Sequence, residues 1–176
     1  MKRFTEAGRQ SIAAGNLYGG LSLALTLPDI CASLEDPGPN KSRKRYERWC
    51  TEWIQPKYTK IIGLERRTVV FLSATDCFQL RCSLIHSGSA EVESAKAGSV
   101  NQFEFVDDSV SSHCNRAQTS TGVTILQLKA SRFSIDVFDA VDAWDDAKVG
   151  VASVQNEKAK LLTIWSRTSW ISHSSD

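Results

Sequence analysis

The sequence predicts a mainly helical protein with a small antiparallel β-hairpin inserted before its last two helices. Several long stretches of the 176-residue chain carry apolar residues every three or four positions, which is the pattern of amphipathic helices. Two β-branched and aromatic runs, at 103–106 and 122–128, favour strands instead. A chain of this length buries one sizeable core. We therefore expect a single domain with a helical core over 1–90, a β element over 99–130 and C-terminal helices over 131–166.

The N-terminal segment 3–35 predicts one long helix, bent near the glycines at 15, 19 and 20 and kinked or ended at Pro28. Its apolar run 17–27 is too short to span a bilayer. The run ends in Pro28-Asp29 and not in the small residues of a signal-peptide cleavage site. We therefore expect a core helix in a cytoplasmic protein, and we expect no membrane partner.

A second helix is predicted over 42–55, after the Pro- and Gly-rich loop 35–40. Ser42 is expected to cap this helix. Residues 68–72 form either a short strand or a buried connection. The apolar stripe of the second helix consists of Tyr46, Trp49, Cys50 and Trp53.

In the second half of the chain, the runs 103–106 and 122–128 are expected to pair as an antiparallel hairpin across a polar connection. Ser131 is expected to cap the next helix, whose apolar side chains recur at helical spacing as far as Trp144. A last helix is expected over 151–165, followed by a frayed end.

The charge is unevenly distributed along a chain whose net charge is only +1. Residues 41–67 hold nine basic against three acidic residues, whereas residues 91–146 hold ten acidic against four basic residues. This asymmetry is expected of a face that binds anions. It is equally expected if the two halves attract each other.

Neither a metal nor a cofactor is expected. The five cysteines, at 31, 50, 77, 82 and 114, show no CxxC or Cys/His ligand spacing, so we expect reduced thiols. The sequence also contains no phosphate-binding loop, GxSxG, HExxH or dinucleotide-binding signature. His113 and His173 lie in predicted loops, and we assign them no role.

The strongest functional lead is the helix predicted between Ser73 and Gly88. Ser73 and Asp76 have the spacing of a capping box, and Gly88 stands where a helix ends. Nearly every face of this helix is apolar, which is typical of a buried helix. A buried guanidinium is costly unless it is paired, so Arg81 must face a partner, a cleft or a subunit boundary.

Arg81 and His86 form an R-x4-H arrangement near the end of that helix. This arrangement resembles the HEPN superfamily of helical bundles, in residues 1–90. The resemblance implies a homodimer whose two R-x4-H motifs build one composite active site, and a metal-independent endoribonuclease with a defence or toxin-like role. It implies that Arg81 polarises the scissile phosphate and that His86 acts as general acid and base. Cys82 stands where the family commonly has Asn, Asp or His.

The two side-chain types suit that chemistry, because a guanidinium stabilises developing phosphorane charge and an imidazole titrates near neutrality. Five residues along a helix place Arg81 and His86 about 140° apart. Ser83 supplies a hydroxyl between them. Three carboxylates are expected to support the pair: Asp29, Asp36 and Asp76. Of these, Asp29 and Asp36 are the candidates to neutralise Arg81.

The basic helix 42–55 offers a candidate surface for RNA, the expected partner. Its exposed cations would contact phosphates, and Tyr46 or Trp49 would stack on bases. These cations are Arg43, Lys44, Arg45 and Arg48. The alternative is a solvated face above an apolar stripe that belongs to the core.

Two hypotheses follow from the sequence. In the first, the chain is a cytoplasmic, homodimeric, HEPN-like protein that binds RNA and is a candidate ribonuclease with Arg81 and His86. In the second, it is a non-catalytic accessory or interaction module in which the same pair is structural. An open cleft or dimer seam at Arg81 favours the first, and an ion pair with Asp29 or Asp36 favours the second.

Overall fold

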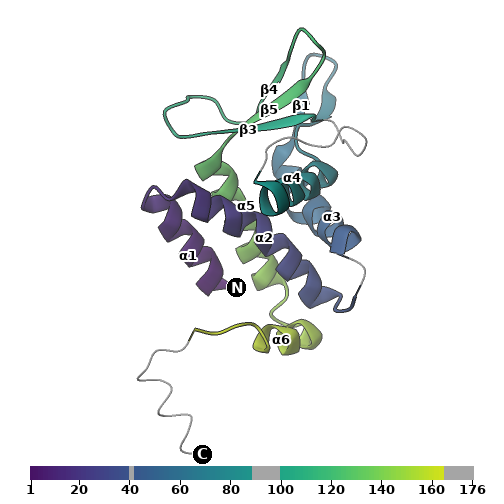
Figure 1. The fold of residues 1–176 in the computed structure, drawn as a ribbon. Coiled ribbons are helices and arrows are strands. Elements are labelled where there is room, and N and C mark those ends of the chain that lie inside the picture. The colour runs from purple at the N-terminus through teal and green to yellow at the C-terminus, as the bar shows by residue number, and fades with distance from the viewer. Residues whose placement is uncertain (40–41, 89–99, 165–176) are drawn as a thin grey trace, which may run out of the picture.

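A computed structural model describes residues 1–39, 42–88 and 100–164, apart from the side chains of His86 and Ser87. The predicted mainly helical class is confirmed (Figure 1). The helices in these ranges are α1 (Lys2–Ala13), α2 (Leu17–Glu35), α3 (Ser42–Trp53), a 3₁₀ turn (Gln55–Tyr58), α4 (Ala74–Ser87), α5 (Ala130–Ala147) and α6 (Ala152–Ala159). The strands are β1 (Thr59–Ile62), β2 (Arg67–Val70), β3 (Gln102–Val106), β4 (Asn115–Gln118) and β5 (Thr124–Lys129).

The central element is α2, which packs against α1, α3, α4, α5 and α6 (Figure 1). Ala24, Leu27 and Cys31 are completely buried along it, at the spacing that places them on one side of a helix. The helix continues through Pro28, where a kink or an end was expected. By length and hydropathy alone α2 could also cross a membrane, and half of that stretch is buried inside the fold.

The prediction of one helix over 3–35 was wrong, because the expected bend is a complete break between α1 and α2. Gly15 adopts a φ of +78°, which a side chain would strain. The Oδ1 of Asn16 then accepts a hydrogen bond from the backbone N–H of Gly19 at 3.0 Å and so caps α2. This break lets α1 fold back along α2 and α5.

The predicted antiparallel pairing of the runs 103–106 and 122–128 was also wrong. β3 lies parallel to β5, with Phe103 opposite Leu126. The polar connection between them contains β4, which forms the antiparallel hairpin with β5. Arg116 of β4 pairs with Leu126 from the edge of β5 that faces away from β3. A connection long enough to hold a third strand removes the need for the flanking runs to pair as a hairpin.

A second hairpin, formed by β1 and β2, lies in the region where only the run 68–72 was considered as a strand. Thr59 pairs with Val70 and Ile62 with Arg67. The turn between the strands has φ values of +72° at Gly63 and +50° at Arg66. The sequence of this hairpin shows no clear alternation of apolar and polar residues, because both faces of the hairpin are largely exposed.

Several helix boundaries differ from those predicted, and α3 ends at Trp53 and not at 55. Ser42 is the first residue of α3 and not its cap, and Ser131 lies inside α5, whose N-cap is Lys129. The Ser131 hydroxyl instead donates to Asp108 Oδ1 at 2.6 Å. α6 ends at Ala159 and not at 165. The expected frayed end, from 166 onwards, lies outside the described residues.

Candidate functional site

Arg81 lies on α4, whose predicted ends are confirmed. The Ser73 hydroxyl accepts from the backbone N–H of Asp76 at 3.1 Å, and Asp76 Oδ2 accepts from the backbone N–H of Ser73 at 2.9 Å. Gly88 closes the helix in the left-handed conformation, with a φ of +61°. These local contacts satisfy backbone groups that a helix leaves open at its ends, and they define the ends of the helix that carries Arg81.

The guanidinium of Arg81 forms an ion pair with Asp29. Its Nη2 donates to Asp29 Oδ2 at 3.0 Å. The two side chains are only 18% and 23% exposed, so water screens this pair less than it screens a surface ion pair. Asp29 is one of the two carboxylates that we expected as a neutralising partner.

Asp29 connects three helices. It lies on α2, its Oδ2 accepts from Arg81 on α4, and its Oδ1 accepts from the Ser42 hydroxyl on α3 at 3.3 Å. A carboxylate that accepts from two elements at once fixes their relative position more firmly than either bond alone. This arrangement places Arg81 at a junction of helices.

The other members of the predicted site have different surroundings. Asp76 is completely buried and belongs to the capping box. Asp36 lies 3.9 Å from Arg48 Nη1. Ser83 is half-buried on α4 between Arg81 and His86, and the side chain of His86 lies outside the described residues. The structure therefore brings Asp29 to Arg81 and leaves the geometry of the R-x4-H pair undescribed.

The predicted cations of α3 are largely engaged by their own chain. Arg43 pairs with Glu47 at 3.0 Å and lies over the ring of Phe78. Arg45 donates to the carbonyl oxygens of Asp36 and Gly38 at 2.9 and 2.7 Å. Arg48 lies 3.8 Å from Glu35, and Lys44 is exposed. Tyr46 and Trp49 are buried in the core, which excludes them from stacking on bases.

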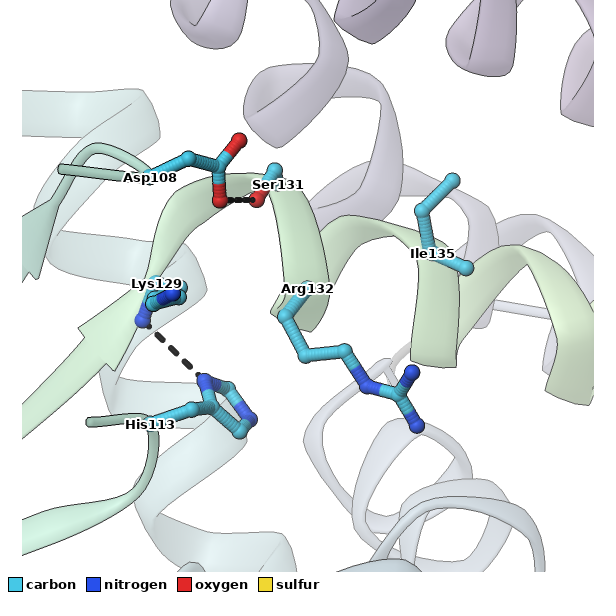
Figure 2. A pocket seen from close by; sticks show the side chains of 6 residues that line it. All are labelled: Asp108, His113, Lys129, Ser131, Arg132 and Ile135. Atoms are coloured by element: carbon cyan, nitrogen blue, oxygen red, sulfur yellow. Dashed lines mark hydrogen bonds between the residues drawn. The ribbon is translucent and has the colours of Figure 1, made fainter. Parts of the chain in front are cut away.

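A second polar site was not expected from the sequence. An open cleft of about 400 Å³ lies at the N-terminal end of α5, lined by Asp108, His113, Lys129, Ser131, Arg132 and Ile135 (Figure 2). In Figure 2, His113 faces the backbone of Lys129, and Arg132 extends from α5 on the other side of the cleft. His113 comes from the connection between β3 and β4, which is why no local pattern marked it.

Both ring nitrogens of His113 have partners. Nδ1 accepts the backbone N–H of Lys129 at 3.1 Å, so the neutral ring carries its proton on Nε2. Nε2 lies 3.4 Å from the hydroxyl oxygen of Tyr58. That hydroxyl donates to Asp136 Oδ2 at 3.1 Å, and Arg132 Nη2 lies 3.1 Å from Asp136 Oδ1.

The surroundings shift two pKa values in this cluster. Burial lowers the pKa of His113, and the charges of Arg132, Lys60 and Lys129 act in the same direction while Asp136 opposes them. Burial, reinforced by Asp136, raises the pKa of Tyr58 above its usual range. Histidine is therefore neutral and tyrosine protonated near pH 7. Because both nitrogens of His113 are used within the fold, the cluster suits a structural role better than a general base.

Metal ligation has no candidate among residues 1–39, 42–88 and 100–164, where no three His, Cys, Asp or Glu side chains converge. The five cysteines are free thiols, and four of them are buried. Buried thiols of this kind pack as small apolar side chains.

Comparisons with known proteins add no relative to this description. No protein-family model, no curated protein and no solved structure matches the chain.

Proposed function

We propose that this chain is a non-catalytic interaction module, built on a HEPN-like helical bundle, in which Arg81 holds α4 against α2. The observation that carries the proposal is the ion pair between Arg81 and Asp29 at 3.0 Å. An arginine that polarises a scissile phosphate must turn its donors towards that phosphate. Arg81 instead directs Nη2 to a carboxylate of its own fold.

Electrostatics supports the same conclusion. A phosphate that approached Arg81 would meet the carboxylate of Asp29 in the place it must occupy, and two anions at such short range repel each other. Displacing Asp29 would leave this partly buried carboxylate without its cation, which is unfavourable. The engagement of Arg43, Arg45 and Arg48 with carboxylates and carbonyl oxygens of the chain also leaves α3 a poorer phosphate surface than its composition suggests.

The test is cleavage of a mixed RNA pool in EDTA by the purified full chain, by Arg81→Lys and by His86→Ala, with folding checked by circular dichroism. We expect no cleavage by any of the three proteins. Arg81→Lys keeps the charge but loses the planar guanidinium, so its thermal midpoint reports the structural role of Arg81 separately.

Metal-independent cleavage by the wild type, lost in a folded His86→Ala variant, would overturn the proposal and establish the ribonuclease of the first hypothesis. Light scattering on the same preparations measures the molar mass and so tests the expected homodimer. A composite HEPN-type site needs two copies of the chain.

A further inference from the structure

The tip of the hairpin formed by β1 and β2 presents aliphatic side chains to solvent. Ile61 is 59% exposed and Ile62 is 45% exposed. Neighbouring residues of a strand point to opposite faces, so neither face of the hairpin end is covered. Leu64, in the turn, is fully exposed. The hairpin tip, defined as residues 60–67, therefore carries three aliphatic side chains that no other part of the described structure covers.

Positive charge surrounds these aliphatic side chains. Lys57, Lys60, Arg66 and Arg67 are exposed along the hairpin, with Glu65 as the single acidic residue between 57 and 67. Glu65 is already neutralised by Arg67, whose Nη2 lies 2.6 Å from its Oε2. The hairpin therefore combines exposed apolar side chains at its tip with an excess of basic over acidic side chains around them.

The base of the hairpin is firmly attached, so the tip is held in place and is not a loose loop. Beyond the ladder, the backbone N–H of Phe71 donates to the carbonyl of Tyr58 at 2.8 Å. Arg116 of β4 donates to the carbonyls of Val70 and Phe71 at 3.1 and 2.8 Å. In Figure 1 this hairpin lies at the end of the molecule opposite α6. The anchoring lowers the ordering cost of any contact made by the tip.

We propose that the hairpin tip docks on an anionic lipid bilayer. Leu64 and the two isoleucines enter the boundary between headgroups and acyl chains, and Lys60 and Arg66 contact anionic headgroups. The aliphatic character of the tip selects this partner over single-stranded RNA, because bases bind by stacking on aromatic rings. The aromatic residues nearest the hairpin, Tyr58 and Phe71, are buried or half-buried at its base.

This inference goes beyond the proposed function and does not depend on the role of Arg81. It also differs from what the sequence alone led us to expect, which was no membrane partner. The reason is that residues 57–67 show no amphipathic helix and no long apolar run. Their membrane-binding character arises only when a tight turn brings three exposed aliphatic residues to one point.

The test is flotation of the full chain with vesicles of phosphatidylcholine alone and with vesicles that also contain phosphatidylserine. We expect binding to the anionic vesicles only, weakened by high salt. Leu64→Ser is expected to weaken binding about tenfold, and Arg66→Glu at least about fivefold. Matched controls far from the tip, Leu162→Ser and Lys2→Glu, also change exposed residues and are expected to bind as the wild type does.

Three results would overturn the proposal: no binding to anionic vesicles, equal binding to neutral vesicles, or equal losses in the tip and control variants. A fluorescent single-stranded RNA serves as the competing partner. The hairpin would be assigned to RNA instead if the wild type bound this RNA but not the vesicles, and if Arg66→Glu weakened the RNA binding.

Discussion

Arg81 has a partner that lies 52 positions away in the chain, and the free energy of that contact depends on how far both side chains are removed from water. With side-chain exposures of 18% and 23%, the Arg81–Asp29 pair is intermediate between a solvated ion pair, worth less than about 1 kcal/mol, and a fully buried one. Removing one partner leaves the other charge partly desolvated and uncompensated.

We therefore predict that Arg81→Met, which keeps much of the side-chain volume, lowers the free energy of unfolding by about 1–3 kcal/mol. Asp29→Asn is expected to cost less, because the amide keeps a hydrogen bond to Ser42 within reach. Urea denaturation measures both. The double variant Arg81→Asp with Asp29→Arg provides the control. If it loses less free energy of unfolding than the two single variants Arg81→Asp and Asp29→Arg lose together, the two side chains interact directly. Purely additive losses contradict that interaction.

His113 makes stability depend on pH in a defined direction. The folded protein lowers the pKa of His113 by burial, so below about pH 6.5 the unfolded chain binds a proton that the folded one does not. Protonation of Nδ1 also removes the acceptor for the N–H of Lys129. Stability is thus fully present above the unfolded pKa and is lost as pH falls from there towards the lower pKa of the folded state.

The prediction is that the wild type loses more stability than His113→Asn between pH 7.5 and pH 5.5, as measured by urea denaturation at each pH. The amide oxygen of asparagine can still accept a backbone N–H but does not titrate. Parallel stability curves for the two proteins would show that the titration of His113 is not coupled to folding. Asp136 and Arg132 on α5, Lys60 on β1 and Lys129 on β5 are the other charged groups of this cluster.

At the scale of elements, the packing of α1 on α5 depends on the absence of a side chain at one position. A Cβ atom added at Gly8 would lie 2.2 Å from Cζ of Phe138, which is far inside van der Waals contact. Both Gly8 and Phe138 are buried. The helices can approach this closely only because Gly8 leaves room for the ring.

Gly8→Ala is therefore expected to destabilise the protein by about 1–3 kcal/mol, although alanine normally stabilises a helix interior relative to glycine. Thermal or urea unfolding measures the change. Combining Gly8→Ala with Phe138→Leu tests the cause, because the smaller side chain should recover part of the loss. A neutral or stabilising Gly8→Ala would contradict the close contact.

At the scale of the whole molecule, α2 joins the other helices and should make their unfolding cooperative. Leu27→Ala removes a completely buried side chain at its centre and is expected to cost about 2–5 kcal/mol. Leu162→Ala, at an exposed leucine after α6, should change stability by less than about 0.5 kcal/mol. Circular dichroism and tryptophan fluorescence should report one coincident transition in each protein, and separate transitions would show independently folding parts.

The sequence by itself determined those features of the molecule that arise within a few residues of one another. Ser73, Asp76 and Gly88 define both ends of α4 through contacts three to five positions apart, and the apolar spacing of α2 and α5 predicted their buried sides. For the same reason the sequence predicted that Arg81, on an apolar helix, needs a partner.

Only the tertiary structure decided which contacts form between distant segments. It selected Asp29 for Arg81, aligned β3 parallel to β5 across a connection that contains β4, and placed His113 between Tyr58 and the backbone of Lys129. It also left the hairpin tip uncovered on both faces. These outcomes depend on the packing of whole helices and strands. The spacing of residue types along the sequence does not determine which distant segment a side chain will contact.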